Sequence, residues 1–310
     1  MRIQTEPGVS EFPDTGPISW RHPLSRVWFE LSLSWRFVFR DLPASWYPSM
    51  LFTAAAWRHV EGSALDLAVS LLKSAVLFWF YIYVFCVSNQ ARGVIEDRLN
   101  KPHRPLVIGL ISVPGAYRRF WAGMAVYTVL GWLFGVLEWV VLWQSVVLLH
   151  NFAGGAKHWY SKNLAMVVGG IVMLAAAWQI VAPIGTVGWR WILVVILTFT
   201  AAISLQDLRD IPGDRATGRR TLPLVIGAWP TRILVCAVMA VLPVLAHFLL
   251  FVPASPSPSA LVACDVTLAG MSWLTAVRCL VVRSPQDDHH TYMTYTYTFC
   301  VALLSAVVVL

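Results

Sequence analysis

Residues 64–105 read ALDLAVSLLKSAVLFWFYIYVFCVSNQARGVIEDRLNKPHRP. The first part of this stretch, 64–88, is apolar and long enough to cross a bilayer as one helix, which takes about 20 residues. The second part, 89–105, is polar, contains Glu96 and Asp97, and ends in prolines that stop a helix. The stretch therefore predicts a membrane-spanning helix whose last turns present carboxylates at one membrane surface.

The rest of the chain repeats this apolar pattern. Of the 310 residues, 58% are hydrophobic and only 13% are charged, whereas a soluble domain is about one-quarter charged. Apolar runs of helix length predict an all-α integral membrane protein with about nine transmembrane helices. These runs lie at 43–60, 64–88, 114–132, 134–151, 162–182, 187–206, 228–252, 258–283 and 290–310. We expect residues 1–40 to form a cytoplasmic and interfacial N-terminal segment, and residues 41–310 a single transmembrane domain.

The distribution of charge excludes one class of partner and predicts an orientation. The net charge is +7, but the basic residues gather at the ends of the apolar runs and leave no basic domain for nucleic acid. The N-terminal segment and the connections after the second, fourth, sixth and eighth runs are rich in Lys and Arg. The positive-inside rule therefore predicts a cytoplasmic N-terminus and cytoplasmic acidic residues. Membrane lipid is an expected partner, and nothing in the sequence implies an obligatory protein partner.

The polar part of the opening stretch is the first of two acidic motifs. At about 100° per residue, its oxygen-bearing side chains share one face of the helix. These side chains are Asn89, Glu96, Asp97 and Asn100. Lys101 and Arg104 follow at once, so cations are expected beside the carboxylates.

The second motif ends the sixth apolar run and reads QDLRDIPGDRATGR over residues 206–219. Its acids would share a face if the helix continued: Asp207, Asp210 and Asp214. Pro212 and Gly213 are expected to loosen the helix there. Arg215 and Arg219 again place cations beside the acids.

Together the motifs predict a magnesium-dependent diphosphate site. Carboxylates at membrane depth are costly and raise one another's pKa values, and a divalent cation removes these penalties. Mg²⁺ prefers oxygen ligands and commonly bridges carboxylates to phosphate oxygens, while Lys and Arg bind the remaining phosphate charge. The expected catalytic and metal-binding residues are Asn89, Glu96, Asp97, Asp207, Asp210 and Asp214. The expected diphosphate-binding residues are Asn100, Lys101, Arg104, Arg215, Arg219 and Lys157. The alternative is a set of solvated loop acids paired with arginines, which two similar motifs at the ends of apolar runs disfavour.

At this point the sequence resembles the UbiA superfamily of intramembrane prenyltransferases. The family's first motif is N-D-x-x-D-x-x-x-D followed by N-x-P-x-R-P, and it is matched by Asn89, Asp97, Asn100, Pro102, Arg104 and Pro105. The second is D-x-x-x-x-x-G-D-R-x-x-G, and it is matched by Asp207, Gly213, Asp214, Arg215 and Gly218. The resemblance covers residues 40–310 and implies a UbiA-like helical bundle with a central, lipid-accessible pocket.

Three departures from the family pattern refine this resemblance. Gln90 and Gly93 stand where most members have Asp, and Glu96 is an additional acid. The resulting string is similar to that of the fungal UbiA-type membrane-bound terpene cyclases. That similarity implies Mg²⁺-dependent ionisation of farnesyl or geranylgeranyl diphosphate, intramolecular cyclisation of the allylic cation and release of diphosphate. If the source is fungal, the endoplasmic reticulum is the expected compartment.

Other functions remain open at this stage. An intermolecular prenyltransferase, which attaches the isoprenyl chain to an aromatic or lipophilic acceptor, shares the ionisation step and therefore the motifs. A transporter or scaffold is disfavoured because the carboxylates lie at one membrane surface and not at mid-depth.

Several weaker signals stand outside the motifs. His150 is a candidate proton acceptor, although a hydrogen-bonded histidine at a helix end is the commoner role. Residues 287–290, Asp-Asp-His-His, look like a metal cluster but are expected to be a solvated loop. Glu138 is an isolated acid in the fourth run, with no partner evident from the sequence.

Overall fold

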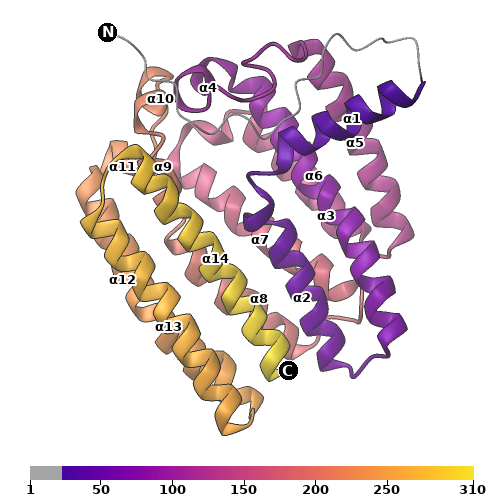
Figure 1. Cartoon of the computed structure of the whole chain (residues 1–310), viewed down its shortest axis with the longest axis vertical. Coiled ribbons are helices and arrows are strands. Elements are labelled where there is room, and N and C mark those ends of the chain that lie inside the picture. The colour runs from indigo at the N-terminus through magenta and orange to yellow at the C-terminus, as the bar shows by residue number, and fades with distance from the viewer. Residues whose placement is uncertain (1–22) are drawn as a thin grey trace.

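The computed structural model describes residues 23–310 (Figure 1). The predictions for residues 1–22, which include much of the N-terminal segment, lie outside the described residues. Each predicted apolar run contains a helix: α2 (Trp46–His59), α3 (Ala64–Arg92), α5 (Val113–Leu133), α6 (Leu137–Asn151), α7 (Trp159–Gln179), α8 (Thr186–Ala201), α12 (Ala228–Ala246), α13 (Pro258–Val281) and α14 (Pro285–Val309). A further helix, α1 (Pro23–Val38), precedes them. In this part of the chain the one β-type pairing is an isolated bridge between His158 and Arg220, which confirms the all-α class.

Six segments within residues 23–310 are long and apolar enough to span a membrane. They are Ala64–Arg92, Trp159–Gln179, Thr186–Leu208, Ala228–Ala254, Pro258–Val281 and Pro285–Val309. The predicted number of nine is therefore not confirmed. The helices α2 and α6 have 14 and 15 residues, or about 21–23 Å at 1.5 Å per residue, which is shorter than a hydrocarbon core of about 30 Å. The helix α5 has 21 residues, but Arg118 and Arg119 lower the hydropathy of its first half.

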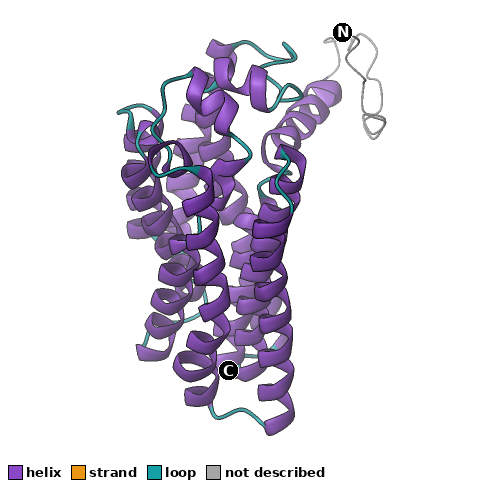
Figure 2. Cartoon of the chain, turned by 90° about the vertical axis from the view of Figure 1, so that its left-hand side faces the viewer, coloured by secondary structure: helices purple, strands orange, loops and turns teal. Residues whose placement is uncertain are grey.

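Short helices gather at one end of the bundle, shown at the top of Figure 1. They are α4 (Val94–Asn100), η3 (Gly155–Lys157), α9 (Leu205–Leu208), α10 (Ile211–Ala216) and α11 (Leu222–Val225). Figure 2 shows the long helices running side by side below this layer. Because α3 and α8 both end there, the two acidic motifs meet at the same end of the molecule.

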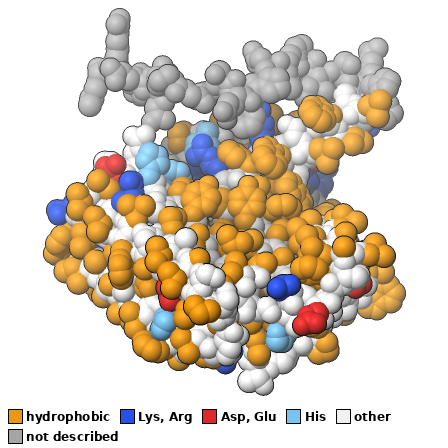
Figure 3. All heavy atoms as spheres, turned by 60° about the horizontal axis from the view of Figure 1, so that its bottom comes forward, with side chains coloured by type: hydrophobic (Ala, Val, Ile, Leu, Met, Phe, Trp, Pro, Cys, Tyr) orange, Lys and Arg blue, Asp and Glu red, His pale blue; other side chains and the backbone are white. Residues whose placement is uncertain are grey.

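The outer surface is apolar along the long helices, as expected for contact with lipid. Leu72, Trp132 and Val281 are each more than two-thirds exposed. In Figure 3, where the end opposite the motifs comes forward, hydrophobic side chains predominate and charged ones are scattered. The lipid-facing surface and the polar motif end together confirm an integral, multi-pass membrane protein.

The start of α14 corrects the interpretation of residues 287–290 as a solvated loop. Asp287 forms a capping box with Ser284 and so belongs to the first turn of the helix. Asp288 is 2% exposed and forms a bidentate ion pair with Arg232 of α12, with both N–O distances at 2.7 Å. His289 Nδ1 forms a hydrogen bond with the guanidinium of Arg209 at 2.7 Å. Within residues 23–310 there is no cluster of three or more His, Cys, Asp or Glu side chains that could hold a metal ion.

Candidate active site

The first motif is broken at Gly93. The helix α3 ends at Arg92 and α4 begins at Val94, so Asn89 and the two acids lie on separate helices instead of one continuous helix as predicted. A Cβ atom on Gly93 would lie 3.1 Å from the Asn89 carbonyl oxygen and about 4 Å from carboxylate oxygens of Glu96 and Asp97. A family-type Asp at position 93 would therefore crowd two existing carboxylates. Glu96 supplies an acid from the next turn in its place.

The second motif is also divided, but the break lies at residues 209–210, before Pro212 and Gly213, where the sequence predicts a loosened helix. The helix α9 ends at Leu208, and α10 begins at Ile211 with Pro212 in its first turn, where a missing N–H costs nothing. The helix α10 packs against α4. Asn100 joins them, because its side chain donates to the Asp210 carbonyl oxygen and accepts from the Gly213 N–H, each at 3.2 Å. The amide of Asn100 is thereby used to hold one motif against the other.

Every motif acid contacts a cation. Arg104 binds both Asp97 oxygens at 2.8 Å, and Lys101 binds Asp210 at 3.1 Å. Arg219 reaches Glu96 at 2.6 Å and Asp214 at 3.6 Å. Lys162 on α7 binds Asp207. These pairs link α4, α7, α9 and α10 into one charged layer at the motif end of the bundle.

The layer is buried, and its carboxylates differ in acidity. Asp97, Asp207 and Asp214 are at most 2% exposed. Burial raises the pKa of Glu96 despite Arg219, and it raises the pKa of Asp214 despite Lys162 and Arg219. Burial acts in the same direction on Asp210, but Lys101, Arg209 and Lys162 outweigh it and lower its pKa to about 2.

The chemistry of the donors suits a hard divalent cation, although among residues 23–310 no three of these acids converge in the positions they now occupy. One oxygen of Asp207 and both oxygens of Asp214 are buried without a hydrogen-bond partner among the described residues. A buried carboxylate oxygen without a partner is costly, and metal coordination satisfies it. All available donors in the layer are oxygens, which suits Mg²⁺ better than a softer metal.

A cavity of about 450 Å³, which we call the motif cavity, opens beside this layer. Its lining includes Asn89 and Glu96 from the first motif, Arg219 from the second and His150 from α6. Lys157 also lines it but is exposed, and its backbone is bonded to that of Arg220. Asp97, Asp207 and Asp214 line neither this cavity nor the one described next.

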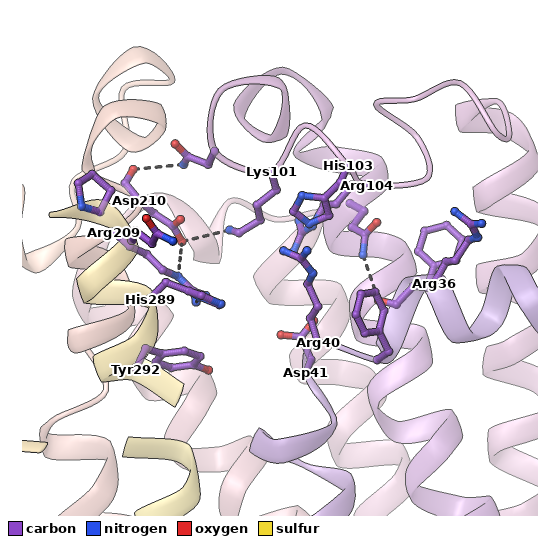
Figure 4. A pocket seen from close by; sticks show the side chains of 16 residues that line it. Arg36, Arg40, Asp41, Lys101, His103, Arg104, Arg209, Asp210, His289 and Tyr292 are labelled. Carbon is purple, nitrogen blue, oxygen red and sulfur yellow. Dashed lines mark hydrogen bonds and ion pairs between the residues drawn. The ribbon is translucent and has the colours of Figure 1, made fainter. Parts of the chain in front are cut away.

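A second cavity of about 360 Å³, the basic chamber, lies against α1 and α14 (Figure 4). Its polar lining residues are Arg36, Arg40, Asp41, Gln90, Asn100, Lys101, His103, Arg104, Arg209, Asp210, Gln286 and His289. The two cavities share no lining residue. The predicted site residues are thus divided between two cavities, with three buried acids outside both.

An aromatic column runs from the motif cavity into the bundle. His150 is 5.5 Å from the ring of Phe85, Phe85 is 5.6 Å from Trp143, and Trp143 stacks on Tyr81 at 4.3 Å. Gly169 of α7 makes room for Trp143, because a Cβ there would lie 2.4 Å from the indole ring. Aromatic faces attract positive charge, but these rings stack on one another, and Phe85, Trp143 and Tyr81 line neither cavity.

Two predicted residues change rank, and one residue outside the predicted set reaches the site. Arg215 is exposed and lines neither cavity, so the structure does not bring it to the site. Arg219 contacts two motif acids instead. Lys162 reaches the buried layer, whereas the sequence favoured its neighbour Lys157. Lys162 lies one turn into α7, and spacing from the motifs carries no signal of this contact.

The fold and the site can now be compared with known proteins. The model of the UbiA prenyltransferase family matches residues 45–301. This chain belongs to the UbiA prenyltransferase family. A UbiA homolog from Archaeoglobus fulgidus, solved with DMAPP and Mg²⁺, superposes with a TM-score of 0.61 at 15% identity, over 89% of this chain and 99% of that one. The superposition confirms the UbiA fold.

Proteins similar in sequence indicate the reaction class, whereas the structural neighbour shows the fold. The somaliensene A/B synthase of Streptomyces somaliensis is 41% identical over 90% of this UbiA chain and 93% of its own length. A diterpene cyclase of Hericium erinaceus is 34% identical over 91% and 88%. A polyprenyl transferase of the same fungus is 32% identical over 90% and 95%. The synthase and the cyclase confirm the predicted resemblance to UbiA-type terpene cyclases.

Proposed function

We propose that this protein is a membrane-bound class I terpene cyclase that ionises farnesyl or geranylgeranyl diphosphate and closes rings within the same molecule. The observation that carries the proposal is the buried acid layer, in which oxygens of Asp207 and Asp214 lack a hydrogen-bond partner among the described residues, next to an aromatic column. Both the synthase and the cyclase relatives support this reaction class.

The residues of the layer have distinct roles in this proposal. Mg²⁺, when bound, supplies Lewis-acid stabilisation of the leaving diphosphate. Its ligands would come from Asn89, Glu96, Asp97, Asp207, Asp210 and Asp214, and the cations now paired with these acids are then released to bind phosphate. Lys101, Lys162 and Arg219 are well placed for this, because each already contacts a second-motif acid. Charge that develops on the departing diphosphate is stabilised by these fixed cations.

The aromatic column would guide the carbocation. Phe85 stacks on Trp143, which is 3% exposed, and a cation that reached these rings would be stabilised by them and kept from water. His150 is 4% exposed, and its Nδ1 has no hydrogen-bond partner among residues 23–310. We assign it the last step, in which it accepts a proton from a carbon next to the cation and leaves an alkene. The C–H electron pair becomes the new π bond.

An intermolecular prenyltransferase is the second candidate. The polyprenyl transferase relative favours it, and the ionising residues would be the same. It differs only in needing an acceptor molecule beside the allylic cation.

We further propose that residues 41–310 form the catalytic domain and that the motif end faces the cytoplasm, as the basic connections predict. The expected compartment, the endoplasmic reticulum for a fungal source, stays a prediction. Cysteine substitutions at Arg98 and Arg58, at opposite ends of the bundle, can be labelled from either side of sealed vesicles. Labelling of position 98 from outside intact cells would contradict the orientation.

The function is tested with the purified protein in lipid, Mg²⁺ and either isoprenyl diphosphate, without an acceptor. Gas chromatography with mass spectrometry should detect a cyclic hydrocarbon that EDTA and Asp207→Asn abolish. If neither substrate gives a hydrocarbon but an added aromatic acceptor is prenylated, the cyclase proposal fails and the transferase replaces it.

A further inference from the structure

A short chain of hydrogen bonds connects the backbone of α3 to Asn89, the first residue of the first motif. The Ser88 hydroxyl donates to the Val84 carbonyl oxygen at 2.7 Å. Asn151, the last residue of α6, donates from Nδ2 to Ser88 Oγ at 2.8 Å. Its Oδ1 accepts from Asn89 Nδ2 at 3.4 Å. We call Ser88 and Asn151, with these bonds, the amide relay; it lies beside the motif cavity, which both asparagines line.

The number of available protons fixes the direction of the amide relay. A serine hydroxyl carries one proton, and that of Ser88 is directed to carbonyl oxygens of its own helix. Ser88 Oγ therefore accepts, so the part of Asn151 that faces it is the NH₂ group. It follows that Asn151 Oδ1 faces Asn89, and that Asn89 presents its own NH₂ group to that oxygen. The other end of the Asn89 amide, its Oδ1, is left for a ligand in the motif cavity.

Burial makes this direction costly to reverse. Ser88 is fully buried and Asn151 is 7% exposed, so water does little to replace a broken bond. A rotated Asn151 amide would bring its oxygen against Ser88 Oγ and its NH₂ group against that of Asn89. This arrangement is satisfied only if Ser88 gives up its bond to Val84 and Asn89 turns its NH₂ group toward the cavity. A metal ion cannot bind an amide through a protonated nitrogen.

We propose that Ser88 and Asn151 are positioning residues for Asn89, and that the amide relay keeps the Asn89 oxygen, instead of its NH₂ group, available to a divalent cation. The proposal rests on the proposed function in one respect, the assignment of Asn89 as a metal ligand. A carboxylate presents oxygen at either end, whereas an amide presents oxygen at only one. An asparagine ligand therefore needs a partner that fixes its orientation, which is the usual role of the residues behind metal ligands. Neither Ser88 nor Asn151 is among the residues that the motifs predict.

The first measurement needs no metal. The chain has four asparagines, Asn89, Asn100, Asn151 and Asn163, so ¹⁵N-asparagine labelling gives an NMR spectrum with four side-chain amide groups. In detergent with EDTA, Ser88→Ala removes the acceptor of the relay and should shift the side-chain signals of Asn89 and Asn151. Ser74→Ala is the matched control, because Ser74 is also fully buried on α3 and also loses a side-chain hydrogen bond, its 2.7 Å contact with Thr53. It should shift none of the four.

The second measurement is the affinity for Mn²⁺, which binds oxygen ligands as Mg²⁺ does and is detected by electron paramagnetic resonance. Ser88→Ala and Asn151→Leu should each weaken Mn²⁺ binding about 10–100-fold, the usual effect of removing the partner of a metal ligand. Asn151→Asp keeps an oxygen toward Asn89, and the Ser88 hydroxyl can turn to its other oxygen, so this variant should bind Mn²⁺ nearly as well as the wild type. Ser74→Ala should bind Mn²⁺ as the wild type does.

The two measurements separate failure of the positioning role from failure of the proposed function. If Asp207→Asn abolishes Mn²⁺ binding but Ser88→Ala binds Mn²⁺ as Ser74→Ala does, the positioning role is refuted and the metal site stands. If Ser88→Ala shifts neither the Asn89 nor the Asn151 signal, the relay is refuted whether or not Mn²⁺ binds. If the wild type binds no Mn²⁺, the proposed function fails and the positioning role fails with it. Shifted signals together with weakened Mn²⁺ binding, restored by Asn151→Asp, support the proposal.

Discussion

The side chain of Asn100 occupies the space that a Cβ atom on Gly213 would need. That atom would lie 2.3 Å from Asn100 Nδ2 and 2.6 Å from its Cγ. The same amide accepts from the Gly213 N–H and donates to the Asp210 carbonyl oxygen. The two motifs therefore fit together at one point, where the amide of Asn100 from the first motif fills the space that Gly213 of the second motif leaves open.

Gly213→Ala should therefore separate the motifs. The methyl group displaces an amide that is bonded at both ends, so we expect a loss of about 1–3 kcal/mol of stability and a large fall in turnover. Thermal unfolding in detergent and hydrocarbon formation are the measurements. Asn100→Ala loses two hydrogen bonds but opens the space, so the double variant should be less damaged than the sum of the two single variants. Simple additivity would contradict the contact.

Lys162→Gln should be far more harmful than Lys157→Gln. The first change leaves the fully buried Asp207 without its cation, which costs about 3–5 kcal/mol for a buried pair. Lys157 is exposed at the rim of the motif cavity, so its loss should leave melting temperature unchanged. Comparing hydrocarbon formation and melting temperature of the two variants checks this order, and equal effects would argue against the buried pair.

Arg219→Gln and Arg215→Gln give a second matched comparison. Arg219 contacts both Glu96 and Asp214, so its loss should reduce turnover by about 100-fold, the scale of removing one group that stabilises developing charge. Arg215 is exposed and should be replaceable with little effect. Activity is measured at saturating Mg²⁺, so that a change in metal affinity does not mask the difference. A larger loss of turnover for Arg215→Gln than for Arg219→Gln would indicate that Arg215 belongs to the site.

The sequence predicts the parts of this site whose residues are close together along the chain, but not the contacts between residues that are far apart along it. The motifs are recognisable because their residues lie close together along the chain, as Asn89 and Asp97 do, and their match to the UbiA patterns indicates the family. The break at Gly93 was not predicted, since periodicity assumes a continuous helix. Contacts made across the bundle left no trace in local spacing, as with Lys162 and Asp207, which are 45 residues apart.

The same limitation applies to the membrane topology and to α14. Hydropathy predicts a helix in each apolar run, but it does not give the helix lengths, which are 14 residues for α2 and 15 for α6. The sequence predicts a loop at Asp288, because its partner, Arg232, lies 56 positions away. Helix ends and ion-pair partners both depend on what a segment packs against, which local composition does not record.

Asp288→Asn tests that distant pair. It leaves Arg232 buried at 5% exposure with a neutral partner, so we expect a loss of about 3–5 kcal/mol. The adjacent Asp287→Asn alters an exposed cap and should change stability little. Because Asp288 lies outside both cavities, the surviving folded fraction of Asp288→Asn should keep the wild-type KM. A raised KM with unchanged melting temperature would assign Asp288 to the site instead.

His150→Phe tests the proposed end of the reaction. Phenylalanine keeps the ring beside Phe85 but removes the buried nitrogen that has no partner, so ionisation should continue while proton removal changes. We expect substrate consumption within about threefold of wild type, with products shifted to alkene isomers or to alcohols formed by water capture. Gas chromatography of total products, normalised to released diphosphate, measures the shift. An unchanged product pattern would mean that another base, such as the departing diphosphate, takes the proton.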